Sequence, residues 1–170
     1  MNIFNKRNRS LSKKIILLGQ FGVGKSSLIE RFVHQEFSEL YITTIGVKID
    51  KKEVQFGDKK YSLLIWDIAG EDAQIKVPAA YKLGAHGAIF VFDLTMPSSF
   101  ESLEQDIAYM KKIIPPIPFV LAGNKADLVN EDEMARIKGI LPNNDYVYSS
   151  AKTGENVENI FTSLVKKMAK

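Results

Sequence analysis

The stretch GQFGVGKS, residues 19–26, decides the fold, because its glycines, lysine and serine have the spacing of a phosphate-binding loop. The four residues before it, 15–18, are continuously apolar, as in a buried parallel strand. After it, Leu28, Ile29, Phe32 and Val33 recur at helical spacing. The pattern therefore predicts a strand, a phosphate loop and a helix. The alternative, a chance glycine-rich turn, is disfavoured by this strand–helix context.

The chemistry of such a loop follows from its shape. Glycines let the backbone curl, so that several N–H groups point at one anion. The N-terminus of the following helix adds partial positive charge. The Lys25 ammonium can reach the outer phosphates of a nucleotide, and the Ser26 hydroxyl can ligate Mg²⁺.

Composition is that of a soluble globular protein of one domain: 170 residues, 45% hydrophobic and 25% charged. The formal charge of +3 comes mainly from lysines and arginines at the two ends. Those ends either make weak contact with acidic lipids or a partner, or are solvated tails. They do not form the concentrated basic face of a nucleic-acid binder, so we expect no nucleic-acid partner.

The chain has no cysteine, which excludes disulfides, cysteine catalysis and thiolate metal sites. Prenylation and palmitoylation are excluded for the same reason, and Asn2 replaces the glycine of the usual myristoylation signal. We therefore expect no lipid anchor. No apolar run approaches the ~18 residues of a membrane helix, and the N-terminus has no signal-peptide pattern. The sequence predicts a cytoplasmic protein, and a monomer.

Period and turn residues predict the remaining elements. We expect residues 1–12 to form a flexible basic arm and residues 13–170 to form one domain. Alternation over 47–56, a turn at 57–60 and an apolar run over 61–66 predict a hairpin whose second strand lies deeper in the sheet. Further strands are expected at 87–92, 117–121 and 145–148. Helices are expected late in 68–83, from a Ser98 or Ser99 cap to Lys112, over 131–138 and over 156–168. The fold class is α/β, a six-stranded, mostly parallel sheet with one antiparallel edge strand and about five helices on both faces.

Polar clusters follow several of these strands. Asp67 and Gly70 follow one strand, Asn124 to Asp127 follow another, and Ser150 to Lys152 follow the last. Ligands of such sheets bind outside the carboxyl ends of the strands. We therefore expect these clusters and the phosphate loop to form a single site.

These motifs resemble those of the Ras superfamily of small GTPases, and most of all its Rab branch. The resemblance rests on GQFGVGKS, on TIG at 44–46, WDIAG at 66–70, NKAD at 124–127 and SSAKTGENV at 149–157, and on YKLGAHGAIFVFDLT at 81–95. It covers about residues 13–168. It implies the P-loop NTPase fold, binding of GTP and GDP with Mg²⁺, and hydrolysis of GTP to GDP and phosphate.

The Asp127 carboxylate can accept two hydrogen bonds from the N1–H and amino groups of guanine. Adenine offers no such donor pair, so this site would reject ATP. By resemblance, Asn124 ties the loops together and Lys125 packs its stem over the base. The full set of residues implied to bind the nucleotide is Phe21, Gly22, Val23, Gly24, Lys25, Ser26, Ser27, Phe37, Tyr41, Thr44, Gly70, Asn124, Lys125, Asp127, Ser150, Ala151 and Lys152. Tyr41 either folds over the phosphates or is exposed.

The resemblance assigns Mg²⁺ to Ser26, Thr44 and, through water, Asp67. It assigns catalysis to Lys25, Thr44, Gly70 and the residue after it, Glu71. Residues about 36–46 and 68–80 would be two switch loops that signal the nucleotide state to an effector, an exchange factor and a GTPase-activating protein. Trp66 is either a packing residue or displayed to partners with Tyr81. We expect His86 to be structural and His34 to be a residue that only ends a helix.

Two residues depart from the family pattern beside the γ-phosphate. Glu71 stands where the family usually has glutamine, which orients the attacking water. At ~6 Å and an effective dielectric near 20, its charge would repel a phosphate charge by roughly 3 kcal/mol, or about two pKa units. Glu71 either still positions water, with a raised pKa, or swings to solvent and leaves a slow hydrolase. Phe21, in place of a small residue, would crowd the space used by an activator's arginine finger.

Two rival functions stay open. One is a pseudo-GTPase, a hydrolysis-impaired scaffold that holds nucleotide. The other, an ATP-using kinase, is disfavoured by Asp127 and by the absence of an acceptor-binding insertion.

Overall fold

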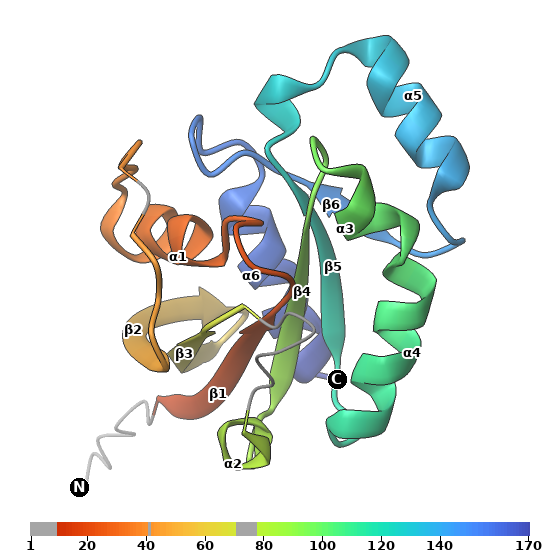
Figure 1. Ribbon diagram of the computed structural model, residues 1–170. Helices are drawn as coiled ribbons and strands as arrows, with labels where there is room; N and C mark the ends of the chain where they lie inside the picture. Colours follow the sequence, from red (N-terminus) through yellow and green to blue (C-terminus); the bar gives the residue numbers. More distant parts are fainter. Residues whose placement is uncertain (1–9, 41, 71–77) are drawn as a thin grey trace, which may run out of the picture.

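The computed structural model describes residues 10–40, 42–70 and 78–170 (Figure 1). A single six-stranded sheet runs in the order β2-β3-β1-β4-β5-β6. Its strands are β1 (Leu11–Leu18), β2 (Val47–Phe56), β3 (Lys59–Ile68), β4 (Gly87–Asp93), β5 (Phe119–Asn124) and β6 (Tyr146–Tyr148). Strand β2 pairs antiparallel with β3 at one edge, and the other pairs are parallel. The predicted sheet, with its single antiparallel edge strand, is confirmed.

Helices cover both faces of this sheet, as predicted (Figure 1). Helices α1 (Lys25–His34) and α6 (Val157–Met168) lie on one face; α3 (Pro97–Glu101), α4 (Leu103–Ile113) and α5 (Glu131–Ile140) lie on the other. The short α2 (Ala79–Lys82) precedes β4, and a 3₁₀ turn, η1 (Ala126–Leu128), follows β5. The β-strand, loop and α-helix predicted around the phosphate loop are therefore β1, residues 19–24 and α1.

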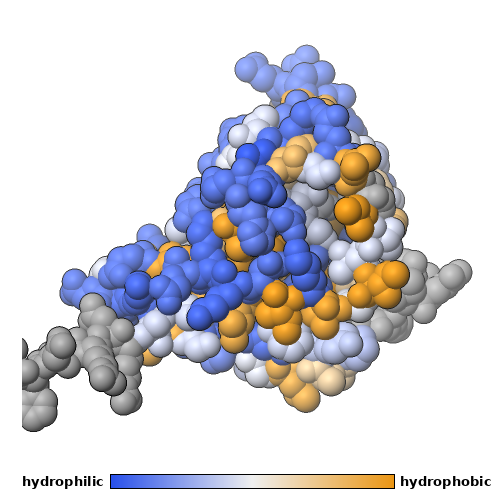
Figure 2. All heavy atoms as spheres, turned by 90° about the vertical axis from the view of Figure 1, so that its left-hand side faces the viewer, coloured by the Kyte–Doolittle hydropathy of each residue, from blue (hydrophilic) through white to orange (hydrophobic). Residues whose placement is uncertain are grey.

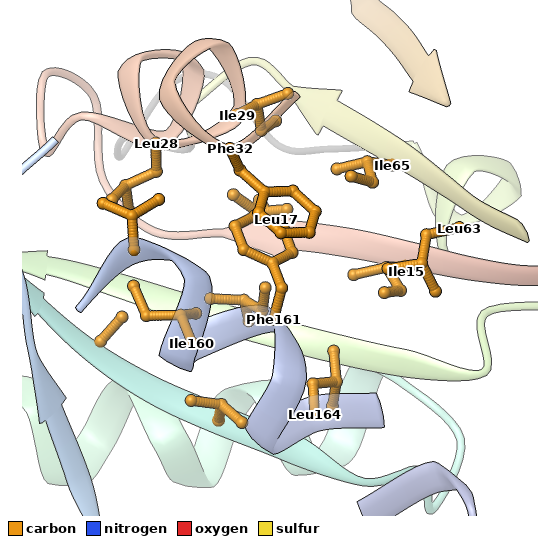
Figure 3. Close-up of a cluster of buried hydrophobic side chains, with 14 of the residues drawn as sticks. Ile15, Leu17, Leu28, Ile29, Phe32, Leu63, Ile65, Ile160, Phe161 and Leu164 are labelled. Atoms are coloured by element: carbon orange, nitrogen blue, oxygen red, sulfur yellow. The ribbon is translucent and has the colours of Figure 1, made fainter. Parts of the chain in front are cut away.

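The apolar run at the end of β1 is buried on both sides. Ile15 and Leu17 pack toward α1 and α6, whereas Ile16 and Leu18 pack toward α3 and α4. Figure 3 shows the first of these clusters, in which Phe32 of α1 stacks on Phe161 of α6 with ring centroids 3.8 Å apart. Burial on both faces explains why polar and apolar residues do not alternate at this end of the strand.

Some predicted boundaries were wrong. Strand β1 begins at Leu11, which pairs with Tyr61, so Leu11 and Ser12 belong to the sheet and not to an arm. Of the rest of the predicted arm, Ser10 precedes the strand and residues 1–9 lie outside the described residues. Strand β5 begins at Phe119 because the prolines before it cannot donate to a ladder, and it runs on to Asn124.

The helix predicted from a Ser98 or Ser99 cap is instead two helices that meet at Ser102. Pro97, not a serine, occupies the first turn of α3. The Ser99 hydroxyl is buried and bonds backbone groups of Asp93, so it serves the sheet end and not a helix cap.

Trp66 and His86 pack as the structural interpretation predicted. Trp66 lies against the second core cluster, with the Lys14 ammonium 3.7 Å from its ring centroid and the Tyr81 ring 6.3 Å away. The Nδ1 atom of His86 accepts a hydrogen bond from the Lys14 backbone N–H at 3.0 Å. Within the described ranges, the helices are all too short or too polar to cross a membrane.

Candidate functional site

A cavity of about 670 Å³ opens at the carboxyl ends of β1, β3 and β5, beside α1. Residues from all four predicted clusters line it: Phe21, Gly22, Gly24, Lys25, Ser26, Ser27, Phe37, Thr44, Asp67, Gly70, Asn124, Lys125, Asp127, Ala151 and Lys152. Val23 and Ser150 do not line it; both are buried beneath it. Tyr41 and Glu71 lie outside the described residues. The fold therefore brings segments more than 120 residues apart to one cavity.

Two glycines of the site are required by close backbone approach. Gly24 has φ 98°, and a Cβ there would lie 2.3 Å from the Asn124 amide nitrogen. A Cβ on Gly70 would lie 2.5 Å from the Phe21 Cα. The segment after β3 thus packs directly on the phosphate loop, which no larger residue at position 70 would allow.

The phosphate loop ends in the first turn of α1. The N-cap residue is Gly24, and no side chain caps this helix end, so its leading N–H groups face the cavity. The Lys25 ammonium donates to the carbonyl oxygens of Gly19 at 3.0 Å and Gln20 at 2.9 Å. This lysine is buried, so the loop holds a cation and a helix N-terminus side by side.

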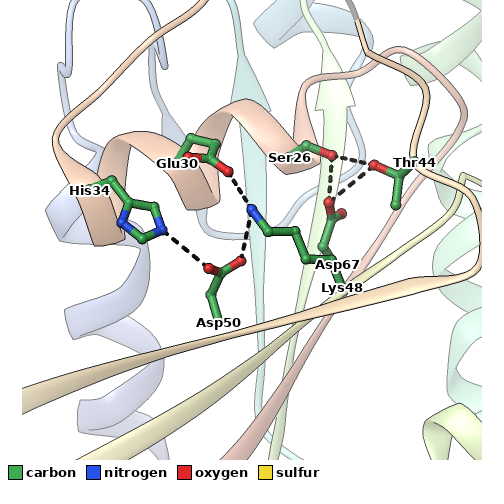
Figure 4. Close-up of polar contacts among 7 residues, drawn as sticks. All are labelled: Ser26, Glu30, His34, Thr44, Lys48, Asp50 and Asp67. Atoms are coloured by element: carbon green, nitrogen blue, oxygen red, sulfur yellow. Dashed lines mark hydrogen bonds and ion pairs between the residues drawn. The ribbon is translucent and has the colours of Figure 1, made fainter.

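Three oxygen-bearing side chains, those of Ser26, Thr44 and Asp67, meet at the start of α1 (Figure 4). The Ser26 hydroxyl donates to Asp67 Oδ2 at 2.5 Å, the Thr44 hydroxyl donates to the same oxygen at 3.2 Å, and the two hydroxyl oxygens are 2.8 Å apart. Thr44 comes from the loop before β2, and Asp67 from β3.

Asp67 is 2% exposed, and its other oxygen, Oδ1, is buried with no hydrogen-bond partner among the described residues. Burial raises the pKa of the Asp67 carboxyl; hydrogen bonds from Ser26 and the charge of Lys25 offset this only in part. An orphaned carboxylate oxygen beside two hydroxyls is a donor set that suits Mg²⁺, a hard cation that prefers oxygen ligands. The three residues therefore fit the metal that the motifs predicted.

A second polar cluster joins α1 to β2 and was missed by the sequence analysis (Figure 4). The Lys48 ammonium lies 2.5 Å from Glu30 Oε1 and 3.5 Å from Asp50 Oδ2, and His34 Nε2 lies 3.2 Å from Asp50 Oδ1. The Glu30 carboxylate raises the pKa of Lys48. His34 is therefore more than a helix-end residue. The spacings, four residues on a helix and two on a strand, were the signal that could have revealed the cluster.

This cluster brackets the loop that carries Thr44. Glu30 and His34 precede residues 36–46, and Lys48 and Asp50 follow them. The ion pairs hold the two ends of the loop together across α1 and β2. Because Lys48 and Glu30 are partly exposed, each pair contributes little on its own, roughly 0–1 kcal/mol.

On the other side of the cavity, Asn124 joins two loops. Its side-chain nitrogen donates to the Val23 carbonyl at 3.1 Å, and its oxygen accepts the Ala151 N–H at 3.2 Å. The Asp127 carboxylate accepts the Ser150 hydroxyl at 2.6 Å and is otherwise exposed to the cavity. Val23 and Ser150 thus do not line the cavity but hydrogen-bond residues that do, Asn124 and Asp127 respectively.

Arg31 is a further residue that the sequence analysis missed. Its Nε donates to the Ala151 carbonyl at 2.8 Å and its terminal nitrogen to the Lys152 carbonyl at 2.5 Å. Both backbone groups of Ala151 are therefore hydrogen-bonded to side chains: its N–H to Asn124 and its C=O to Arg31. No local pattern in the sequence reveals a contact over 120 residues.

Comparison with known proteins agrees with this geometry. The family model described as "Ras family" matches residues 14–170. The chain belongs to the Ras family. Among its relatives, "Ras-related protein Rab7" of Cenchrus ciliaris is 37% identical over 96% of this chain and 85% of its own length. "Ras-related protein RABG3f" of Arabidopsis thaliana is 37% identical over 94% and 83%, and "Ras-related protein Rab-1" of Theileria annulata 39% identical over 90% and 72%.

The predicted resemblance to the Rab branch of the Ras superfamily is thereby confirmed, as are the fold class and the enzyme class. The protein is a Rab-like small GTPase, and the cavity lies where the ligands of such open sheets bind.

The loop of residues 36–46 gives this GTPase an apolar outer surface. Leu40, Ile42 and Ile45 are exposed, Ile45 to 92%, and Ile49 of β2 continues the surface. Figure 2 views the side that carries α1 and β2, where apolar side chains gather beside a mostly hydrophilic surface. Exposed apolar side chains that gather in this way mark sites of protein contact.

Proposed function

We propose that this Rab-like GTPase is a molecular switch that binds GTP and GDP with Mg²⁺ and hydrolyses GTP to GDP and phosphate. One observation supports the proposal: a single cavity unites the phosphate loop, the oxygens of Ser26, Thr44 and Asp67, and Asp127, the residue expected to read the base. The test is to denature the purified protein and identify the nucleotide it releases. Guanine nucleotide supports the proposal; adenine nucleotide, or guanine and adenine binding with equal affinity, refutes it.

The side chains divide the chemistry among them. Lys25 and the N-terminus of α1 place positive charge against the phosphates, and preorganised charge of this kind stabilises phosphoryl transfer. When bound, Mg²⁺ supplies further positive charge against the phosphate oxygens. Ser26, Thr44 and Asp67 would hold it, while Asp127 accepts the two donors of guanine.

The switch itself would lie in residues 36–46 and 68–80, of which 41 and 71–77 are outside the described residues. Thr44 and Gly70 would contact the γ-phosphate and order these segments. The ion pairs of Lys48 join residues on either side of the first segment, Glu30 before it and Asp50 after it. The exposed apolar residues of this segment are our candidates for contact with an effector, an exchange factor and a GTPase-activating protein. The monomeric state, cytoplasmic location and absence of nucleic-acid partners stay predictions.

The geometry of residues 150–152 leads to a first prediction, for Arg31→Ala. Removing the guanidinium leaves the carbonyls of Ala151 and Lys152 without their charged donor and loosens the loop beside the base. Hydrogen bonds to charged groups contribute about 1.5–3 kcal/mol each, so we expect GDP to dissociate roughly 10-fold faster or more. The measurement is release of a fluorescent GDP analogue. The matched control is Arg136→Ala, on the exposed side of α5. An unchanged rate in Arg31→Ala would contradict the assignment.

A second prediction concerns Glu71, whose charge would lie beside the γ-phosphate. We expect Glu71→Gln to hydrolyse GTP at a rate that differs from wild type by up to roughly 100-fold near neutral pH, because charge repulsion of roughly 3 kcal/mol is removed. The wild-type rate should depend on pH, since a carboxylate titrates, and the variant rate should depend on it less. Single-turnover phosphate release over a pH series measures both. Equal rates at every pH would exclude a role for Glu71.

The same assay separates hydrolysis from the rival function, a scaffold that holds nucleotide. A scaffold would keep bound GTP intact over many hours in both proteins, whereas the proposed enzyme releases one phosphate per bound GTP.

A further inference from the structure

We propose that Asp93, which does not line the cavity, sets how tightly guanine nucleotide is held, by anchoring the ammonium of Lys125. The inference rests on the proposed function. Asp93 is the last residue of β4 and is 3% exposed. Its Oδ2 lies 2.5 Å from Lys125 Nζ, a separation that among the ion pairs of the described residues only Lys48 and Glu30 match. Asp93 is thus a positioning residue that acts through one that lines the cavity.

The Asp93 carboxylate is held in one orientation. Its Oδ1 accepts the Thr95 backbone N–H at 2.8 Å and the Thr95 hydroxyl at 2.7 Å. The backbone of Asp93 is held separately, since the Ser99 hydroxyl accepts its N–H at 2.9 Å and donates to its carbonyl at 2.8 Å. One oxygen is therefore occupied by the turn, and the other is directed to Lys125.

Lys125 joins three segments of the site. Its ammonium also donates to the Gly22 carbonyl of the phosphate loop at 3.1 Å, so it bridges the ends of β4 and β5 and that loop. Its backbone has φ 66°, in the left-handed region that costs a non-glycine residue about 1–2 kcal/mol. Such strain persists only where the surroundings hold the residue in place. The ion pair with the buried carboxylate of Asp93 is a contact that does so.

Fixing a lysine side chain has an entropic cost of roughly 2 kcal/mol. The ion pair with Asp93 offsets this cost in the folded protein, before nucleotide binds. The Lys125 stem is therefore already ordered along the cavity. Without the carboxylate, the ammonium keeps only the Gly22 carbonyl among the described residues, and the stem samples other rotamers. The nucleotide then loses packing over the base, and Gly22 loses a constraint on the phosphate loop. Both losses speed dissociation.

The experiment measures dissociation of a fluorescent GDP analogue from the full-length protein with Mg²⁺. Asp93→Asn keeps the shape of the side chain and an oxygen for Thr95 but removes the charge. We expect GDP to leave at least 10-fold faster. The matched control, Ser99→Ala, disturbs the same strand end without contacting Lys125; it should melt at a lower temperature yet release GDP within twofold of the wild-type rate.

A double-mutant cycle with Lys125→Met decides whether Asp93 acts through Lys125. We expect Asp93→Asn to change the dissociation rate less than twofold in the Lys125→Met background. A full effect in that background, or none in the wild-type background, overturns the inference while leaving the proposed function intact. Failure of the wild-type protein to bind GDP would instead refute the proposed function. If Asp93→Asn does not fold, Thr95→Val removes one contact to the same carboxylate and should accelerate release by a few fold, again only when Lys125 is present.

Discussion

Asp127→Asn should lower the affinity of the protein for GDP by at least roughly 100-fold, because the carboxylate would accept two hydrogen bonds from guanine and each is worth about 1.5–3 kcal/mol. In the asparagine variant one oxygen becomes an NH₂ group, which faces a donor of the base and leaves it unpaired. The loss is therefore larger than that of one hydrogen bond. The lost interactions are those with the base and not those with the phosphates. Any binding that depends on the phosphates alone should therefore persist.

The asparagine variant is chosen to spare the fold. Its remaining oxygen can still accept the Ser150 hydroxyl, which is buried and bonded to Asp127 at 2.6 Å. The melting temperature of the nucleotide-free protein should then change little. Calorimetric titration with GDP and with ADP gives both affinities; the variant should lose its preference for GDP. Asp132→Asn, an exposed change in the first turn of α5, is the control. A variant that still prefers GDP would show that Asp127 does not read the base.

Asp67→Asn should make the metal-free protein more stable and weaken its response to Mg²⁺. In the wild type, Asp67 is buried with one oxygen orphaned, so its negative charge is unfavourable when no cation is present. A neutral amide removes that charge. The amide lacks the negative charge that favours a divalent cation, so loss of this carboxylate should weaken Mg²⁺ binding by about 10- to 100-fold. The wild type should melt at a higher temperature with Mg²⁺ and nucleotide than without, and the variant should show less of this increase.

The pH dependence of this difference has a definite sign. Burial raises the folded-state pKa of Asp67 above its usual 3.8, so the unfolded chain releases this proton first. The stability that the protonated carboxyl provides is complete below pH 3.8 and is lost as the pH rises through the folded-state pKa. The advantage of Asp67→Asn over the metal-free wild type should therefore grow from acid toward neutral pH. Thermal melts in a chelator across this range measure it, with Asp58→Asn in the exposed β2–β3 turn as the control. A constant difference at all pH values would contradict the prediction.

Much of the fold follows from local patterns. The apolar run 15–18 is buried on both sides of the sheet, the 47–56 alternation forms the edge strand, and the deeper strand of the hairpin lies inside it. Errors arose at element ends. The helix cap predicted at Ser98 or Ser99 is absent. The Ser99 hydroxyl instead bonds the backbone N–H and C=O of Asp93, two buried groups at the end of β4 that need hydrogen-bond partners.

The phosphate loop, the single antiparallel edge strand and many of the residues that line the cavity could be predicted from the chain alone, because these depend on spacing, period and the rule that ligands bind at strand ends. Only the tertiary structure decided which residues hold that cavity in shape. Asp93 reaches Lys125, Arg31 reaches Ala151, and Lys48 reaches Glu30 across separate elements. A side-chain contact depends on distances of a few ångströms between segments that only the assembled sheet brings together, and no local period in the chain encodes it.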